Sequence, residues 1–178
     1  MKTKRLFLRE RTKKAILDIK EKTVEEQFLF FGCTTQSELN THLQNAERLL
    51  RPNKAPWIMW DIVELNTNTV VGTCDFHNWF EEHQRAELGY MLNDKQQGKG
   101  FMHEALHAIF DYGFTKLNLN RIEAFIGTSN QKSINVVSKF SFKKEGLLRE
   151  HYKFNGVIHD SLVYALLKKE YTEFCTNS

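Results

Sequence analysis

A glycine-bearing turn between a strand pattern and a helix pattern constrains this chain more than any other feature. Residues 86–92 are mostly apolar and β-prone, and apolar residues then recur at helical spacing from Met102 to Leu117. Gly98 and Gly100 lie in the turn between them. Such a turn presents backbone N–H groups at the positive end of the helix dipole, and glycine lets an anion approach them closely. The junction therefore predicts a site for a phosphate-bearing ligand.

Length and composition predict a single domain that covers residues 1–178. A net charge of +3 is too small by itself to indicate nucleic-acid or membrane binding. We interpret the basic residues near the start, Lys2, Lys4 and Arg5, as solvated surface. The three cysteines lack metal-site spacing, and the chain has no signal-peptide pattern and no apolar run of membrane-spanning length. We therefore expect free thiols, a cytoplasmic location, no metal, and no nucleic-acid or membrane partner.

The apolar pattern predicts the element order β-α-α-β-β-β-α-β-α-β, with a further strand near 147–154. Expected strands cover 5–10, 57–64, 70–77, 86–92, 121–127 and 160–167, and expected helices cover 13–21, 38–50, about four turns after the glycine turn, and 131–140. The phenylalanine-rich stretch 25–37 is expected to be less regular. This order predicts an α/β fold with a mixed, mostly antiparallel sheet of six to seven strands. The crossover from 86–92 to 121–127 makes that pair parallel, with the glycine turn at the carboxyl end of its first strand.

Two common phosphate-binding motifs do not fit the turn. A P-loop needs a Gly-x-x-x-x-Gly-Lys-Ser/Thr pattern, which the residues around Gly98 and Gly100 do not have. A dinucleotide fingerprint needs a third glycine or alanine where this chain has His103, and it belongs at the first strand of its unit. The turn therefore requires a different explanation.

Several stretches supply that explanation: Ala86-Glu-Leu-Gly-Tyr90, Gln97-Gly-Lys-Gly-Phe-Met-His-Glu-Ala105, Arg121-Ile-Glu-Ala124, Asn130-Gln-Lys-Ser133, and Phe142-Lys-Lys-Glu-Gly-Leu-Leu-Arg149. With these stretches the chain resembles the GNAT superfamily of N-acetyltransferases, most of all the RimJ/RimL (ribosomal-protein N-terminal acetyltransferase) type. The resemblance runs from about Thr69 to Tyr171, and less distinctly from Arg5. It implies the GNAT fold, with helices on both faces of the sheet and a splayed parallel pair of strands.

The resemblance also implies acetyl-CoA as cosubstrate, with its pyrophosphate on the N–H groups of residues 97–102 and its pantetheine along the strand that ends at Leu92. The residues implied to bind it are Tyr90, Met91, Leu92, Lys95, Gln97, Gly98, Lys99, Gly100, Phe101, Met102, Asn130 and Ser133. Lys95 stands where the family usually has Arg or Gln. A lysine supplies a point charge rather than the planar fork of an arginine.

Acetyl transfer to an amine needs a neutral amine and a donor for the oxyanion, and the departing thiolate gains from a proton. Glu87 is the candidate base or amine anchor. The alternative is a surface glutamate that pairs with Arg85 or Arg121. Asp75, on the neighbouring strand, is a further candidate for reaching the site or relaying a proton through water.

Ser133 is the candidate proton donor for the thiolate, and the resemblance implies that Asn130 hydrogen-bonds the pantetheine. Both residue types also suit a helix start. Many GNAT enzymes have a tyrosine seven residues after this asparagine, where this chain has Val137. We therefore expect a serine-type arrangement or protonation by solvent, with Tyr152 and Tyr164 in reserve.

A further departure from the family is Ser141, which replaces the glycine after the short helix 131–140. A left-handed conformation there costs a serine roughly 1 kcal/mol. The departure should affect stability more than chemistry.

The expected function is acetyl-CoA-dependent N-acetyl transfer to a primary amine in a ternary complex, by a monomer or homodimer. A free α-amine has a pKa of about 7.7–8.0 and a lysine-type amine one of about 10.4, so a site with one glutamate suits a protein N-terminal α-amine or a comparable small molecule. Polyamine or aminoglycoside acceptors stay open, because Glu25, Glu26, Glu81 and Glu82 supply carboxylates. A non-catalytic CoA-binding module is another alternative. The stretch from Phe28 to Phe31 is expected to form one wall of the acceptor groove.

Overall fold

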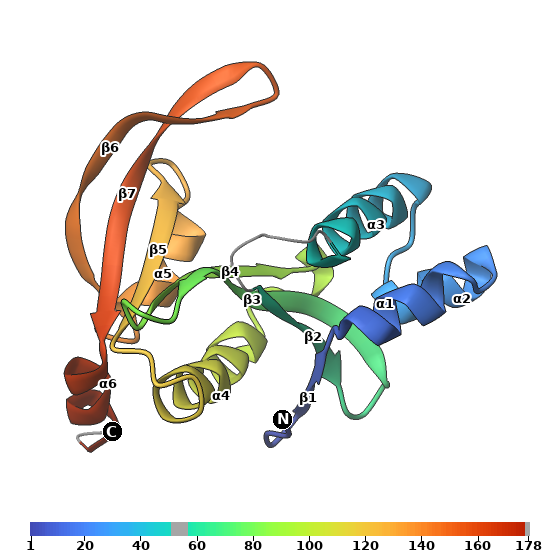
Figure 1. Ribbon diagram of the computed structural model, residues 1–178, viewed down its shortest axis with the longest axis horizontal. Coiled ribbons are helices and arrows are strands. Elements are labelled where there is room, and N and C mark those ends of the chain that lie inside the picture. Colours follow the sequence, from blue (N-terminus) through green and yellow to red (C-terminus); the bar gives the residue numbers. More distant parts are fainter. Residues whose placement is uncertain (51–56, 177–178) are drawn as a thin grey trace. The chain divides into compact units, whose positions relative to one another are not determined.

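The computed structural model describes residues 1–50 and 57–176 of the chain (Figure 1). The chain forms two compact units. The first unit comprises Met1–His77 and Gly89–Ile109, and the second comprises Asn78–Leu88 and Phe110–Ser178.

The strands are β1 (Leu6–Glu10), β2 (Ile58–Glu64), β3 (Thr69–Phe80), β4 (Arg85–Leu92), β5 (Arg121–Gly127), β6 (Lys143–Phe154) and β7 (Val157–Leu167). The helices are α1 (Lys13–Lys20), α2 (Val24–Phe31), α3 (Gln36–Leu50), the 3-10 turn η1 (Asp94–Gln96), α4 (Phe101–Thr115), α5 (Gln131–Ser138) and α6 (Lys168–Thr176). The strands form one seven-stranded sheet in the order β1-β2-β3-β4-β5-β7-β6. β4 and β5 are parallel, whereas β1 pairs with β2, β2 with β3, β5 with β7 and β6 with β7 in antiparallel fashion. The predicted α/β fold with its parallel crossover pair is confirmed.

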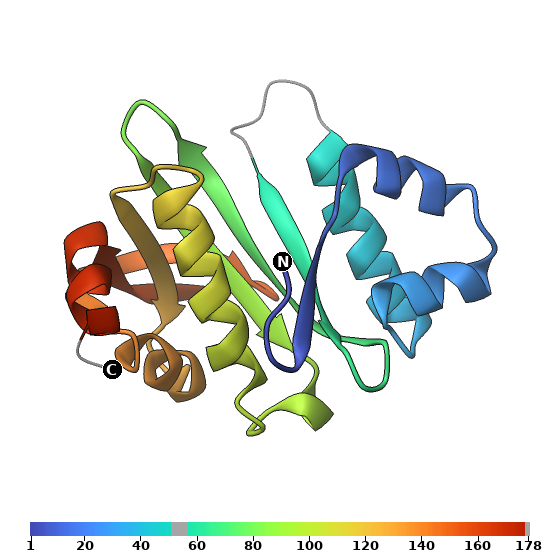
Figure 2. The ribbon, with the colours of Figure 1, turned by 90° about the horizontal axis from the view of Figure 1, so that it is seen from below.

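In the first unit, α1, α2 and α3 pack beside β1 and β2 (Figure 2). Their contact is a cluster of buried apolar side chains that includes Ile16, Phe31, Leu39 and Ala46 of the helices and Met59 of β2. In α1 and α3 the buried positions follow helical spacing, as Ile16 with Ile19 and Ala46 with Leu49, so one face of each of these two helices is buried.

The expectation of an irregular stretch from residue 25 is wrong, because residues Val24–Phe31 form helix α2. The helix begins with a capping box. The Thr23 hydroxyl accepts from the Glu26 amide, and the Glu26 carboxylate accepts from the Thr23 amide. Gly32 ends the helix in a left-handed conformation. The pattern Thr-x-x-Glu is a sequence signal for a helix start, so this helix could have been predicted.

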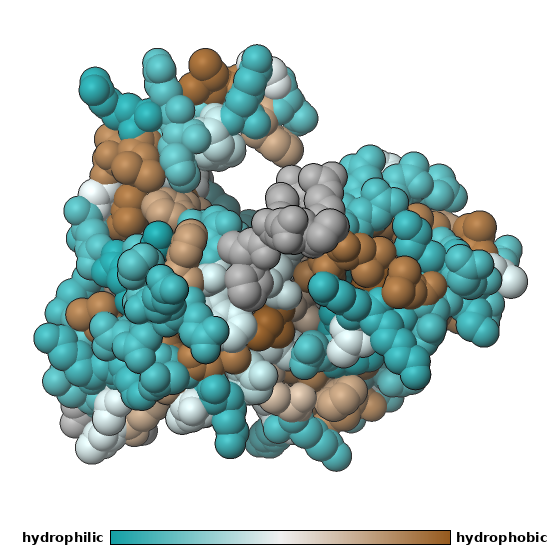
Figure 3. Space-filling model, in the orientation of Figure 1, coloured by the Kyte–Doolittle hydropathy of each residue, from teal (hydrophilic) through white to brown (hydrophobic). Residues whose placement is uncertain are grey.

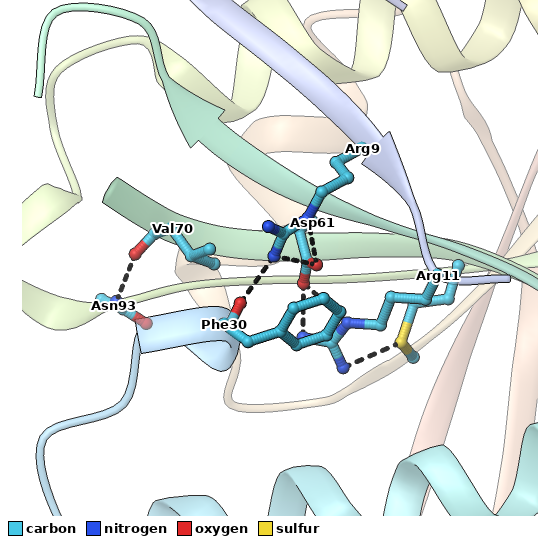
Figure 4. A network of polar contacts seen from close by, with 7 residues as sticks. Arg9, Arg11, Phe30, Asp61, Val70 and Asn93 are labelled. Atoms are coloured by element: carbon cyan, nitrogen blue, oxygen red, sulfur yellow. Dashed lines mark hydrogen bonds and ion pairs between the residues drawn. The ribbon is translucent and has the colours of Figure 1, made fainter. Parts of the chain in front are cut away.

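A buried charge network attaches α2 to the sheet (Figure 4). Asp61 of β2 is fully buried and accepts from the Arg9 Nη2 atom at 2.8 Å and from the Arg11 Nε atom at 2.6 Å. Arg9 Nη2 also donates to the carbonyl oxygen of Phe30 at 2.6 Å. The Arg9 and Arg11 guanidinium groups lie over the rings of Phe30 and Phe31. The position of the phenylalanine-rich helix is therefore set by charged groups as well as by apolar packing.

In the second unit, β7 pairs with β5 on one side and with β6 on the other. The predicted hairpin turn is confirmed, since Asn155 and Gly156 both have positive φ. Apolar side chains are exposed along the β6–β7 hairpin, where brown surface is visible at the upper left of Figure 3. They are Leu147, Leu148, Tyr152, Phe154, Val157 and Ile158.

Several element ends differ from the sequence expectation. β3 continues to Phe80 and β6 begins at Lys143, so both are longer than predicted. α6 was not predicted. It follows β7 and packs Tyr171 against the rings of Phe110 and Phe114. Ser141 has the expected left-handed conformation, with φ of 63°.

Two expectations from composition can be compared with the structure. Cys33, Cys74 and Cys175 are free thiols. Within residues 1–50 and 57–176, no helix is long and apolar enough to cross a membrane.

Candidate active site

The predicted strand–turn–helix junction is confirmed and lies in the first unit. β4 ends at Leu92, η1 follows, and α4 begins at Phe101. Gly98 and Gly100 both have φ of +78°, a conformation that side chains disfavour. The Glu104 amide donates to the Gly100 carbonyl at 3.1 Å. By helix geometry, the N–H groups of residues 101–103 therefore precede the helical hydrogen-bond ladder.

Other contacts brace the turn. The Gln97 amide donates to the Asp94 carbonyl at 3.2 Å, and its side chain donates to the Asp94 carboxylate at 3.0 Å. The Lys99 ammonium donates to the Gln96 side chain at 2.7 Å. Because the Gln97 N–H group is engaged inside the turn, the N–H groups after it are the ones placed for an anion. The side chains of Phe101 and Met102 are buried, so these two residues offer an anion their backbone.

Arg5 contacts the turn from the beginning of the chain. Its Nη1 atom donates to the Lys99 carbonyl at 2.9 Å, and its Nε atom lies 2.7 Å from Oε2 of Glu104. The Arg5 guanidinium also lies over the Phe101 ring, 4.8 Å from the centroid. Arg5 is exposed, as expected of a surface charge, with 41% of its side chain accessible, but it also binds Glu104 and the turn. Local sequence gives no signal for this contact, because Glu104 is 99 residues away in the chain.

Glu104 is held as a carboxylate at the start of α4. Burial alone would raise its pKa. Hydrogen bonds from the Thr3 hydroxyl, at 2.6 Å, and from Arg5 outweigh that effect, so the pKa lies below the ordinary value of 4.5. The charge pair anchors the segment before β1 to the first turn of α4.

A second polar cluster in the first unit is centred on Asp75 of β3, which is buried. Its Oδ1 atom accepts from Trp57 Nε1 at 3.0 Å and lies 2.7 Å from Nδ1 of His77. The carboxylate also lies against the backbone of Gly89 on β4, where a Cβ atom would stand 2.5 Å from Oδ2. Asp75 was a sequence candidate, whereas His77 and Trp57 were not, because neither belongs to a recognisable motif.

Glu87 lies in the second unit, on β4 opposite Glu123 of β5 in the strand register. The two arginines considered as its partners both bind Glu123, Arg85 through Nη1 and Arg121 through Nε, each at 2.7 Å. Arg121 also pairs with Glu145. Glu87 itself is half-buried.

Asn130 is the N-cap of α5, as its residue type predicts. Its side-chain oxygen accepts from the Ser133 amide at 3.1 Å. Val137 is fully buried, so the position that is tyrosine in many GNAT enzymes belongs here to the core. Of the reserve tyrosines, Tyr164 is buried, and the Tyr152 hydroxyl lies 2.9 Å from where a Cβ atom would stand on Gly127.

Metal ligands were not expected from the sequence. Among the residues that the structure describes, no group of three or more His, Cys, Asp or Glu side chains is placed to hold a metal ion.

Comparison with known proteins places the chain in a family. A sequence model of the acetyltransferase (GNAT) domain matches residues 5–143. The chain belongs to the GNAT family. The GNAT relatives include YoaA of Bacillus subtilis, an uncharacterized N-acetyltransferase that is 30% identical over 165 residues, which cover 85% of this chain and 93% of YoaA. The N-acetyltransferase p20 of Bacillus licheniformis, also uncharacterized, is 46% identical over 112 residues, which cover 63% of each protein.

A solved GNAT structure shows the same fold. A chimera of the spermidine N-acetyltransferase SpeG from Vibrio cholerae and hSSAT superimposes with a TM-score of 0.72. The two sequences are 20% identical, and the match covers 94% of this chain and 98% of the chimera.

Proposed function

We propose that this protein is an acetyl-CoA-dependent N-acetyltransferase that moves the acetyl group to a primary amine in a ternary complex. The observation that carries the proposal is the turn with Gly98 and Gly100 at positive φ, which leads into the amide-bearing start of α4. Nothing lies within 4 Å of a Cβ position built on Gly98, so the space beside the turn is open. An open, amide-lined helix start suits a pyrophosphate.

The residues proposed to bind acetyl-CoA are those that the family resemblance implies. In the first unit, the N–H groups from Gly98 to Met102 take the pyrophosphate, with Lys95 and Lys99 as nearby charges. The main chain from Tyr90 to Leu92 takes the pantetheine. The resemblance also assigns Asn130 and Ser133 of the second unit to acetyl-CoA. Bound acetyl-CoA supplies the electrophilic thioester carbonyl.

The proposed chemistry removes two protons from the acceptor nitrogen. The acceptor ammonium first loses a proton, and the neutral amine then attacks the thioester carbonyl, so that a C–N bond forms and the C–S bond breaks. Glu87 acts on the acceptor as base or anchor. Ser133 passes a proton to the departing thiolate and regains one from the nitrogen of the new amide.

The acceptor class favoured here is an α-amine, as the RimJ/RimL resemblance implies. About one-tenth of such an amine is neutral at pH 7. An amine with a pKa of about 10.4 is half neutral only at a pH more than three units higher, so the site must do more to deprotonate it. A polyamine is the second candidate, because the SpeG relative acts on spermidine. Of the carboxylates expected to attract a polyamine, Glu26 already caps α2.

Calorimetry with acetyl-CoA tests the proposal. We expect micromolar-range binding that weakens when Gly100 is replaced by Val. Gly146→Val is the matched control, since a Cβ atom at Gly146 meets nothing within 4 Å. A folded, ligand-free sample that does not bind acetyl-CoA would refute the proposal.

Thiol release against a panel of amines then identifies the acceptor. The panel contains peptides with free N-termini, polyamines, amino acids and aminoglycosides. Binding without thioester consumption by any of them would indicate a CoA-binding module instead. Unchanged turnover in Glu87→Gln and Ser133→Ala would remove these two catalytic assignments while leaving the enzyme assignment in place.

A further inference from the structure

The cluster of Asp75, His77 and Trp57 has the geometry of an oriented histidine. Asp75 and His77 are two residues apart on β3, so their side chains share one face of the strand. The buried Asp75 carboxylate lies 2.7 Å from His77 Nδ1, and the Trp57 indole donates to the same oxygen. A carboxylate in this position favours the proton on Nδ1. In the neutral ring the lone pair is then on Nε2.

The same cluster lies against the strand proposed to carry the thioester arm. The Asp75 carboxylate packs on the backbone of Gly89, which has no side chain to displace it. Tyr90, Met91 and Leu92 follow directly, and their main chain is the proposed pantetheine partner. About one third of the His77 side chain is exposed, 36% by area, so the ring is accessible to a small amine.

We propose that His77 is the general base that takes the proton of the acceptor ammonium, and that Asp75 and Trp57 are positioning residues for it. The inference rests on the proposed acetyltransferase function. With His77 as the base, the role of Glu87 is to anchor the amine. His77 Nε2 accepts one proton from the ammonium and releases it to solvent after the transfer. The second amine proton goes to the thiolate, so that the products are an amide, a thiol and one released proton.

The chemistry of the groups favours this division of roles. A free imidazole has a pKa of about 6.5 and a free glutamate one of about 4.3, against about 7.8 for an α-amine. Proton transfer from the α-ammonium therefore spans about 1.3 units to an imidazole and about 3.5 units to a glutamate. General bases are most effective when their pKa is close to the working pH.

The first test is His77→Gln with an α-amine substrate. We expect kcat to fall about 100-fold, while the Kd for acetyl-CoA stays within twofold of the parent value. The deficit should shrink above about pH 9, where the α-amine is already neutral. His83→Gln, in the loop before β4, is the matched control and should keep the parent rate. A kcat for His77→Gln within twofold of the parent, with acetyl-CoA still bound, would overturn the inference and leave the proposed function standing.

Chemical rescue gives a second readout that a purely structural role would not show. Added imidazole should restore part of the turnover of His77→Ala and should leave the parent unchanged. Asp75→Asn should lower kcat by less than His77→Gln does, and imidazole should not rescue it, because its histidine is present but misoriented. Absence of any rescue in a folded His77→Ala variant would count against the base role. If the parent protein neither binds acetyl-CoA nor acetylates any amine, both the proposed function and this inference fail.

Gly89→Ala, a substitution on β4, tests the same cluster. The new Cβ atom would lie 2.5 Å from Asp75 Oδ2, so the carboxylate must move and His77 loses its orientation. We expect kcat to fall, and we expect the pH dependence of kcat to match that of Asp75→Asn. Gly146→Ala, with open space around its Cβ position, is the control. Parent-like kcat in a folded Gly89→Ala would show that the position of Asp75 does not matter.

Discussion

Glu104, in the first turn of α4, accepts hydrogen bonds from both the backbone N–H group and the Nε atom of Arg5, each at 2.7 Å. The same arginine donates to the carbonyl oxygen of Lys99 inside the glycine turn. One side chain therefore links the segment before β1, the turn and the start of α4. This link makes the shape of the proposed pyrophosphate site dependent on a residue near the start of the chain.

Loss of the Arg5 side chain should weaken acetyl-CoA binding. Arg5→Ala removes the contact with Lys99, and we expect Kd to rise about two- to fivefold, since a partly exposed ion pair contributes roughly 0.5–1 kcal/mol. The Kd of Arg5→Lys should lie between those of the parent and Arg5→Ala, because a lysine keeps the charge but cannot reproduce the planar guanidinium contacts. Calorimetry measures the effect, with Arg149→Ala on β6 as the equal-charge control. Equal Kd values for Arg5→Ala and Arg149→Ala would contradict this prediction.

Glu104 should contribute stability that depends on pH. Folding lowers its pKa below 4.5, so the contribution is complete above that value and is lost as the pH falls through the lower folded pKa. We expect Glu104→Gln to have a smaller free energy of unfolding than the parent at neutral pH. The difference should narrow below pH 4.5. Urea unfolding across this range tests the prediction, and parallel pH curves for the two proteins would argue against it.

Gly98 offers a way to separate stability from binding. Gly98→Ala should lower the free energy of unfolding by about 1–2 kcal/mol, because an alanine is strained at φ of +78°. Gly98→Asn should lose less, since asparagine tolerates the left-handed region. Both variants should weaken acetyl-CoA binding, because each places a side chain beside the amides. If Gly98→Asn binds like the parent, the phosphate does not lie over this residue.

Asp61 should be among the most sensitive positions in the first unit. Asp61→Asn leaves Arg11 buried without its counter-charge, and we expect a loss of about 3–5 kcal/mol in the free energy of unfolding. Arg9→Ala should lose less, because 34% of the Arg9 side chain is exposed and water can replace its partner. Urea unfolding of the two variants gives the comparison. A smaller loss for Asp61→Asn than for Arg9→Ala would contradict it.

The local pattern was enough to predict the parts of the fold that are encoded locally. The strand before the turn, the two glycines and the apolar face of α4 are adjacent in sequence, and their arrangement is confirmed. Ser141 shows the same for a single residue, since its left-handed conformation follows from its place after α5. The helix α2 was equally predictable from Thr23 and Glu26. Its apolar residues do not recur at clear helical spacing, so hydrophobic periodicity alone did not predict this helix.

The missed features depend on contacts between distant segments. Arg5 looks like any exposed cation until Glu104 is placed beside it. His77 looks like a scattered histidine until the indole of Trp57 and the backbone of Gly89 enclose its aspartate partner. Residue spacing within one segment cannot predict such contacts, because they depend on strand register and on the path of the chain between the two segments.

The attachment of α2 has a consequence for how this protein can change. Arg9 binds the carbonyl oxygen of Phe30, which every residue type possesses, and the buried Asp61 holds Arg9 in place. Exposed side chains of α2, such as Leu29, can therefore be exchanged without releasing the helix from the sheet. The sequence analysis expects α2 to form a wall of the acceptor groove. Natural or laboratory selection could therefore change the amine that is accepted through exposed side chains of α2, while the helix stays attached to the sheet.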